Sequence, residues 1–405
     1  MNKFSKHLPE SWGLVLSAFA SAYGIGLLSL LALPFLISAV INGFNVNEAT
    51  AGYIVSAEFA FTMIASLIVA PFMATAPRRT IAIIGSVTAI AANIFSASAA
   101  SVEVLTVFRC IAGIGAGLCL ACGNACVSSA KNPDQVAGHM NVLFVGMMIV
   151  VMLVFADVME SNGLAGLYYT IAITMSVMLL LVLKMPQKAN LTSEHHDTQH
   201  PVIDIKIFSG VGVLMLIAMF LFSARDTMGW AFVEQVGTKV GYDGPTLGLL
   251  FSLQAFIGLA GPLLASIIGK RFGIRLPVII GIVATGLVTL GYVLGAESKM
   301  MYTIAVLINA AVYFYTLAYM TALAASLDKG GRVAAASGSF LTLGVAIGPS
   351  ISGTLIAIGG YQLSAIAIAI TALLTLLCVI APLAKARERY SDMSESQVYK
   401  TASAN

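Results

Sequence analysis

The sequence predicts an all-α integral membrane protein with twelve transmembrane helices arranged as two bundles of six. Two observations of composition indicate a membrane protein, because 59% of the 405 residues are hydrophobic and only 10% are charged, whereas soluble domains carry about 25% charged residues. So few polar side chains cannot cover a water-soluble surface of this size. The third observation is the length of the apolar runs, since a helix needs about 20 apolar residues to cross a bilayer.

The apolar runs fall into two sets of six. The first set lies at 12–40, 49–74, 80–99, 103–129, 138–158 and 163–185, and the second at 207–234, 245–268, 276–296, 300–326, 333–358 and 361–384. The longest polar stretch separates the two sets.

These runs divide the chain into four parts. We expect an N-terminal six-helix bundle over residues 1–186 and a C-terminal six-helix bundle over 207–385. Residues 187–206 form the linker between them, and 386–405 form a polar tail. Both the linker and the tail are expected on the cytoplasmic side.

The distribution of Lys and Arg predicts how the chain is oriented. With the N-terminus in the cytoplasm, 17 basic residues lie in loops on the inside, and only Lys239 and Lys299 lie outside. Short cytoplasmic loops are enriched in basic residues, so we expect a multi-pass protein of the plasma membrane, or of the inner membrane in a Gram-negative bacterium, with both termini cytoplasmic. The dispersed charges and the net charge of +3 do not favour nucleic acid as a partner.

Two clusters of metal-ligand residue types occur in the chain. His195, His196 and His200 lie in the linker, and Cys119, Cys122 and Cys126 lie at helical spacing in the fourth span. Polar linkers are usually solvated, and the three Cys have no His beside them. We therefore predict a connector and helix packing, with no metal and no other cofactor.

Four ionisable residues lie inside the predicted spans: Glu58, Arg109, Arg225 and Asp226. Charges in a bilayer are costly and usually face a cavity or a partner. A rise of 1.5 Å per residue places them roughly 10 to 13 Å from the outer helix ends, so they share one layer. The alternative is a purely structural ion pair.

Uncharged polar and aromatic residues fall in or near the same layer. We predict that they line a central cavity to which helices 1, 2, 4, 7, 8 and 10 contribute, and that they bind substrate. Alternatively, the Asn and Gln side chains form isolated hydrogen bonds between helices, and Trp230 anchors the chain at the membrane interface. The predicted substrate-binding set is Tyr23, Arg109, Asn124, Arg225, Trp230, Gln254, Asn309 and Tyr313.

Four further carboxylates lie at the outer ends of predicted helices. They are expected to be solvated there, with a role at the cavity entrance as the alternative. These residues are Glu103, Asp157, Glu160 and Glu234.

The stretch from Arg109 to Gly117, RCIAGIGAG, resembles the fourth-helix signature of the major facilitator superfamily, R-x-x-x-G-x-G-x-G. The basic loop between the second and third spans, APRRT, keeps Arg78 and Arg79 but lacks the family's Gly and Asp. The loop GKRFGIR at 269–275 matches that pattern better. The resemblance covers residues 10–385 and implies the two-bundle fold and a transport function.

The predicted function is proton-coupled secondary active transport of a small organic solute by alternating access, in which one half rocks against the other. The buried Arg109 and Arg225 favour a solute that bears a carboxylate. Glu58 and Asp226 are the predicted proton-coupling residues, because opening and closing a cavity changes how readily a carboxylate binds a proton. In the family, the arginine at the position of Arg109 is often tied to this coupling.

The runner-up function is a proton-driven multidrug or metabolite efflux antiporter, in which Glu58 and Asp226 bind the charge of a cation. Many antiporters of the family have a Gly-Pro-rich fifth helix, whereas residues 142–158 contain no Pro.

An enzyme is not predicted, because H-E-x-x-H, G-x-S-x-G and G-x-x-x-x-G-K-[ST] are all missing from the sequence. A sensor of the same fold stays open. One chain holds both halves, so we expect a monomer.

Overall fold

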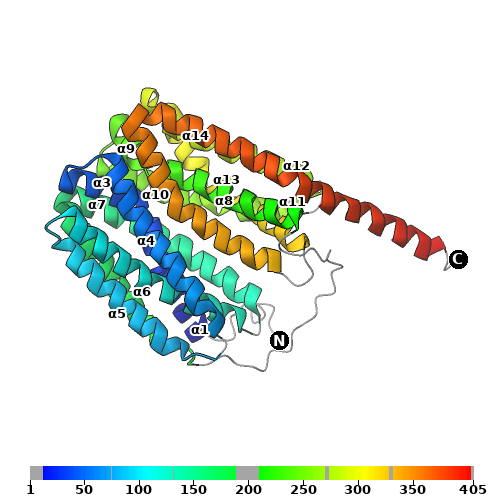
Figure 1. Ribbon diagram of the computed structural model, residues 1–405, viewed down its shortest axis with the longest axis horizontal. Helices are drawn as coiled ribbons and strands as arrows, with labels where there is room; N and C mark the ends of the chain where they lie inside the picture. The colour runs from blue at the N-terminus through cyan, green and yellow to red at the C-terminus, as the bar shows by residue number, and fades with distance from the viewer. Residues whose placement is uncertain are drawn as a thin grey trace.

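The computed structural model describes residues 12–73, 75–130, 132–187, 209–269, 273–327 and 332–402. Every regular element in these residues is a helix. The helices run roughly along one long axis, and Figure 1 shows the start of the first described helix and the end of the last one toward the same end of the molecule. We call this the termini end and the opposite end the far end.

The first span is broken into short pieces. It consists of α1 (Trp12–Phe19), a π-helical turn η2 (Ala20–Ile25), α2 (Leu28–Leu31) and α3 (Leu33–Phe44). Pro34 lies in the first turn of α3, where its missing N–H costs no helical hydrogen bond. Breaks of this kind in a buried helix often occur at functional sites.

Four further helices complete the N-terminal bundle. The polar residues Asn47 and Ser101 cap the second and the fourth spans, because their side chains accept hydrogen bonds from backbone N–H groups of the first turn. The last helix reverses direction at Gly163, whose φ of 58° suits glycine because it has no Cβ. The helices are α4 (Glu48–Val69) with η3 (Ala70–Phe72), α5 (Arg78–Ala97), α6 (Val102–Ser128) and α7 (Pro133–Val182).

The C-terminal bundle is built in the same way. Its last helix reverses at Gly359 and Gly360, the second of which has a φ of 70°, and continues to Ala402. The elements are α8 (Gly210–Trp230), α9 (Val233–Lys239), α10 (Gly244–Gly258), α11 (Ala260–Ile268), α12 (Arg275–Val293), η4 (Gly295–Glu297), α13 (Lys299–Ser326) and α14 (Arg332–Ala402).

The helices fit the predicted twelve spans. Within the described residues, nine helices are long and apolar enough to cross a membrane. Two of them, α7 and α14, each contain two crossings because they reverse at glycines, and the shorter helices from α1 to α3 supply the first span. The all-α membrane fold is therefore confirmed. Most of the predicted linker, with His195, His196 and His200, lies outside the described residues.

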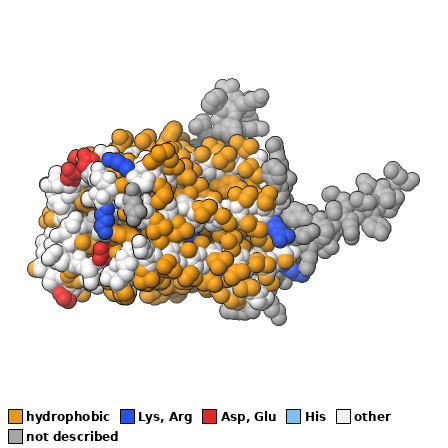
Figure 2. Space-filling model, turned by 90° about the horizontal axis from the view of Figure 1, so that it is seen from above, with side chains coloured by type: hydrophobic (Ala, Val, Ile, Leu, Met, Phe, Trp, Pro, Cys, Tyr) orange, Lys and Arg blue, Asp and Glu red, His pale blue; other side chains and the backbone are white. Residues whose placement is uncertain are grey.

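The surface has the pattern of a protein that sits in a bilayer. Figure 2 shows hydrophobic side chains over the middle of the molecule, whereas acidic and basic side chains gather toward its two ends. Large apolar residues such as Ile68, Ile173 and Leu287 are exposed on the helices, which is expected where lipid rather than water is the neighbour.

Small residues let the helices of one bundle approach closely. On α6, a Cβ at Gly113 would meet the backbone carbonyl oxygen of Glu58 on α4, and a Cβ at Gly117 would meet that of Thr62. The signature glycines therefore bring α4 against α6. The predicted packing role of the α6 cysteines is also seen, because all three are buried free thiols.

The two bundles meet in the half of the molecule nearer the far end. The backbone N–H of Ser350 on α14 donates to Ser56 Oγ on α4 at 3.0 Å. The Ser252 hydroxyl on α10 donates to the carbonyl oxygen of Ile149 on α7, also at 3.0 Å. Hydroxyls of Tyr53 and Thr354 lie 2.8 Å apart, and Ser38 donates to Glu234.

We predict that Gly113→Ala destabilises the N-terminal bundle by about 1 to 3 kcal/mol, because the added methyl forces α4 and α6 apart. Gly146→Ala on α7 is the matched control, since a Cβ there meets nothing within 4 Å. Thermal unfolding of the detergent-solubilised protein measures the difference. Equal melting temperatures for the two variants would contradict the close packing at Gly113.

Candidate functional site

An ion pair lies inside the N-terminal bundle. Arg109 Nη1 on α6 is 3.4 Å from Glu58 Oε2 on α4, and the two residues are 0% and 1% exposed. Because the two side chains are shielded from solvent, each charge is stabilised by the opposite charge and not by water. The pair therefore joins two of the predicted proton-coupling residues.

The rest of the Arg109 side chain is also satisfied. Nη1 donates to Asn93 Oδ1 at 3.1 Å, and Nη2 and Nε donate to Ser96 Oγ at 2.7 and 3.1 Å. Nη2 also approaches the carbonyl oxygen of Ala92, and the guanidinium lies 4.3 Å from the centre of the Tyr168 ring. Each nitrogen of Arg109 thus has a protein partner, which leaves little capacity for a substrate anion.

A second charged cluster lies in the C-terminal bundle and differs from the first. Arg225 on α8 is fully buried, and its Nη1 donates to Thr289 Oγ1 on α12 at 2.9 Å. Its Nη2 has no hydrogen-bond partner among the described residues, and neither have Asp226 Oδ1 and Tyr292 Oη. Polar atoms left unsatisfied in the protein interior are uncommon, so this cluster has capacity for a ligand or a proton.

Tyr313 on α13 closes the C-terminal cluster on one side. Its ring stacks on Phe222 with centroids 5.1 Å apart, and the Arg225 guanidinium lies 5.3 Å from the Phe222 ring. Arg225 and Tyr313 therefore both lie against the Phe222 ring, with Asp226 beside Arg225 in the chain.

Trp230 and Gln254 lie where the bundles meet. The Trp230 ring packs 5.4 Å from that of Phe251 on α10, which is itself 5.8 Å from Phe35 of the N-terminal bundle. Trp230 is buried, so the structure does not support its alternative interpretation as a lipid-facing interfacial anchor. Gln254 is also buried, and its Oε1 has no partner within the described residues.

Three other predicted site residues differ in their surroundings. Tyr23 contacts the ring of Phe144 and donates to Asn141 Oδ1 at 3.4 Å. Asn309 is buried on α13, and Asn124 is exposed on α6. The predicted single layer is thus distributed over two intrabundle clusters and the bundle interface.

One of the carboxylates predicted to be solvated is buried. Glu103, Asp157 and Glu160 are exposed, but Glu234 on α9 is only 5% exposed. Its Oε2 accepts from Ser38 of the other bundle, and its Oε1 accepts from Thr238 at 3.3 Å. The prediction was wrong for Glu234 because α9, which continues the seventh span, packs against α3 and buries this side chain. The sequence pattern did not reveal that packing.

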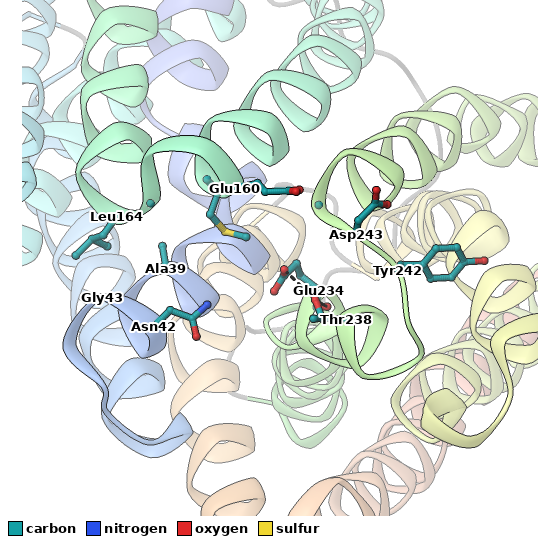
Figure 3. Close-up of a pocket in the computed structure, with 12 residues that line it drawn as sticks. Ala39, Asn42, Gly43, Glu160, Leu164, Glu234, Thr238, Tyr242 and Asp243 are labelled. Carbon is teal, nitrogen blue, oxygen red and sulfur yellow. Dashed lines mark hydrogen bonds between the residues drawn. The ribbon is translucent and has the colours of Figure 1, made fainter.

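Glu234 lines a pocket of about 430 Å³ at the far end, between α3, α7 and α9. Figure 3 shows Glu160 and Asp243 approaching this space from α7 and from the start of α10. Asp243 caps α10 by accepting from the Thr246 N–H. That hydrogen bond lowers the pKa of the Asp243 carboxyl, so this side of the pocket carries a negative charge.

A family model gives the class of the protein. The model of the Major Facilitator Superfamily matches residues 14–233 and 215–401. The chain belongs to the major facilitator superfamily. It is thus a multi-pass membrane protein of a transporter family, which confirms the resemblance of the α6 signature.

Solved transporter structures have the same fold. The nucleoside transporter NupG is 14% identical with a TM-score of 0.70, and covers 92% of this chain and 98% of its own. The D-xylose-proton symporter is 16% identical with a TM-score of 0.67, and covers 92% and 97%. A bacterial homologue of the human lysosomal transporter Spinster, in an inward-facing conformation, is 16% identical at a TM-score of 0.67, with 92% and 96% covered. No match was found among curated proteins.

Sequence reasoning missed several partners of the buried charges in this superfamily member. Asn93 and Ser96 lie three residues apart in the apolar run of α5, a spacing that places both on one helix face. That polar pair was a usable signal. Tyr168, Thr289 and Tyr292 gave none, because a single Tyr or Thr in a membrane helix is common.

Two arginines at the start of α5 hold the termini end of the N-terminal bundle. Arg78 is buried and donates to the carbonyl oxygen of Ala125 and to Ser129 Oγ at the end of α6. A cation at a helix C-terminus is favourable. Arg79 donates to the carbonyl oxygen of Met185 at 2.6 Å. The two arginines that this sequence keeps from the family loop therefore connect three helices.

We predict that Glu58→Leu destabilises the protein by about 3 to 5 kcal/mol, because it leaves the Arg109 charge buried without its counter-charge. The double variant Glu58→Leu/Arg109→Leu should lose much less than the sum of the two single variants. Thermal unfolding of the purified protein measures all three, with exposed Glu103→Leu as the control. Additive losses would contradict the coupling.

Proposed function

We propose that the protein is a proton-coupled secondary transporter that moves a small organic solute across the membrane by alternating access of its two bundles. The observation that carries the proposal is the contrast between the two buried arginines. Arg109 is satisfied by its own bundle, whereas Arg225 and Asp226 each keep an unsatisfied polar atom. The C-terminal cluster therefore has the capacity to bind.

The chemistry of these unsatisfied atoms favours a solute with a carboxylate. A buried donor without a partner costs about 1 to 3 kcal/mol, and more when it is charged. The Nη2 group of Arg225 is a donor that a carboxylate oxygen would satisfy. Trp230 and Gln254, at the bundle interface, supply an aromatic face and an amide for the remainder of the solute.

Asp226 is the proposed site of the coupled proton. Its Oδ1 is buried without a partner, so protonation removes a charge that nothing satisfies directly. The adjacent Arg225 is the opposing influence, since a nearby cation favours the ionised carboxylate. A solute anion bound to Arg225 would compete for that cation and favour the protonated form of Asp226. Solute and proton would then bind together.

The ion pair of Arg109 and Glu58 is the second proposed coupling element. Protonation of Glu58 would leave Arg109 held by Asn93, Ser96, the carbonyl oxygen of Ala92 and the Tyr168 ring. The contact between α4 and α6 would weaken, and α4 also meets α14 of the other bundle through Ser56 and Ser350. A proton on Glu58 would thereby influence the bundle interface.

The closed far end is proposed to face the outside, with the termini, the linker and the tail in the cytoplasm. The 17 to 2 asymmetry of Lys and Arg supports this orientation. Fold neighbours that include a proton symporter support the coupling by analogy. One chain contains both bundles, so we propose that a monomer carries out transport, in the plasma membrane or the bacterial inner membrane.

Efflux of a cation by proton antiport is the second candidate. The far-end pocket favours it, because Glu160, Glu234 and Asp243 line this space together. A carboxylate solute that enters through such a pocket would be repelled, whereas a cation would be attracted. The proton movement that accompanies the solute distinguishes the two functions.

In proteoliposomes, we expect an added carboxylate substrate to drive protons inward, and we expect Asp226→Asn to abolish this flux. Exchange of labelled for unlabelled solute should persist, because asparagine resembles the protonated carboxyl. Internal pH and solute uptake are measured over a panel of carboxylates, sugars and cations. Asp157→Asn, an exposed carboxylate on α7, is the control.

Two outcomes would contradict this function. Proton flux that Asp226→Asn leaves unchanged would exclude Asp226 as the coupling site, and proton efflux on adding a cation would establish the antiporter instead. Arg225→Gln tests the substrate class. The loss of a charged hydrogen bond should weaken the apparent affinity for a carboxylate by about tenfold or more, but not that for a sugar.

A fused reporter tests the orientation. Alkaline phosphatase, which is active only outside the cytoplasm, should be inactive when fused after Ala384 and active when inserted after Gly295 in the loop between α12 and α13. The reverse pattern would overturn the proposed topology.

A further inference from the structure

The carboxyl of Glu234 connects the two bundles. Of the four hydrogen bonds between the bundles that were described above, the bond from Ser38 to Glu234 is the one whose acceptor is a carboxylate. Ser38 on α3 donates to Oε2, while Thr238, one turn along α9, donates to Oε1. Glu234 is 5% exposed, and the pocket that it lines extends away from it at the far end.

The charged groups around Glu234 do not neutralise it. Glu160 of α7 and Asp243, just before α10, line the same pocket, and α3 contributes no ionisable residue. Lys239 on α9 lies 4.3 Å from the centre of the Tyr361 ring. Among the described residues, no ion pair of Glu234 is found.

Two aromatic residues and a second lysine complete these surroundings. Tyr302 of α13 donates to the carbonyl oxygen of Val233, and Tyr361 of α14 donates to Gln235 Oε1. Lys299 donates to the carbonyl oxygen of Gly241 and lies 4.0 Å from the centre of the Tyr242 ring. Among the described residues, therefore, no cation is paired with the buried carboxyl of Glu234.

These surroundings determine whether the Glu234 carboxyl is protonated or ionised. Burial without a paired cation favours the neutral form of the carboxyl, whereas the hydrogen bonds from Ser38 and Thr238 favour the ionised form. Burial is the larger of the two influences. The neutral carboxyl keeps its bond with Ser38, because a hydroxyl is both donor and acceptor. When the bundles separate at the far end, Ser38 leaves and water hydrates Glu234, which then favours the ionised form.

We propose that Glu234 is a proton-binding residue of the far-end gate, which takes up a proton as the far end closes and releases it as the far end opens. The proton passes between the carboxyl and water in the pocket, with no other bond made or broken. This inference rests on the proposed transport function and adds a proton site at the gate, apart from Asp226. Proton binding from the far side would thereby favour closure of that side.

Trp230 supplies the measurement. It packs on Phe251, which contacts Phe35 across the bundle interface, so separation at the far end should expose its indole. The chain contains two tryptophans, and Trp12→Phe leaves Trp230 as the only one. In nanodiscs without solute, we expect quenching of Trp230 by acrylamide to rise as the pH is raised from about 5 to about 8.

Three variants in the Trp12→Phe background assign this pH dependence. Glu234→Gln resembles the protonated residue, and it should give low quenching at every pH. Glu160→Gln, an exposed carboxylate of the same pocket, should keep the rise with pH. Ser38→Ala removes the bond across the interface, and it should give higher quenching than the parent at low pH.

The proposal is overturned if Trp230 quenching does not depend on pH, or if Glu234→Gln keeps the dependence of the parent. If Glu234→Gln does not fold, Glu234→Asp replaces it, and its shortened carboxyl should shift the pH midpoint of quenching. The solute-driven proton flux lost in Asp226→Asn is a separate readout. A failed gate inference therefore leaves the transport proposal standing, and the converse also holds.

Discussion

The structure depends on one constraint, which is that the hydrocarbon of the bilayer supplies no water to satisfy a polar group. Arg109, on α6, meets this constraint with partners from three other helices, namely α4, α5 and α7. Because the partners come from different helices, the ion pair with Glu58 also fixes how those helices pack. The glycines at 113 and 117 let α4 approach α6 closely enough for the pair to form.

The two bundles differ in how they satisfy their buried charges. The proposed function rests on this difference. A cluster that its own bundle saturates holds a helix packing in place and changes only if a proton breaks it. In the proposed mechanism, a cluster with unsatisfied atoms, such as that of Arg225 and Asp226, would change when a solute or a proton binds. An energetic division of this kind, with one rigid half and one responsive half, is a reasonable basis for coupling solute binding to motion between bundles.

Most of the fold was predictable because bilayer thickness sets helix length, so hydrophobic runs and basic loops carry the information. The candidate site was predictable only in its charges. Arg109 and Glu58 stood out in apolar runs, but whether Arg109 faced a cavity or its own bundle depends on helix rotation, which composition does not encode. Glu234 was misassigned for a related reason, since distance from a helix end says nothing about what packs over it.

The proposed gate meets a requirement of proton coupling that a central binding site alone does not meet. A carrier leaks protons if its coupling carboxylate titrates freely from both sides, so access to that carboxylate must depend on the gate. A gate carboxyl that favours closure when it is protonated from the far side links the pH on that side to the conformation. Glu234 is suited to this proposed role for two reasons. Ser38 donates to it only when the bundles meet, and the pocket that it lines lies at the far end alone.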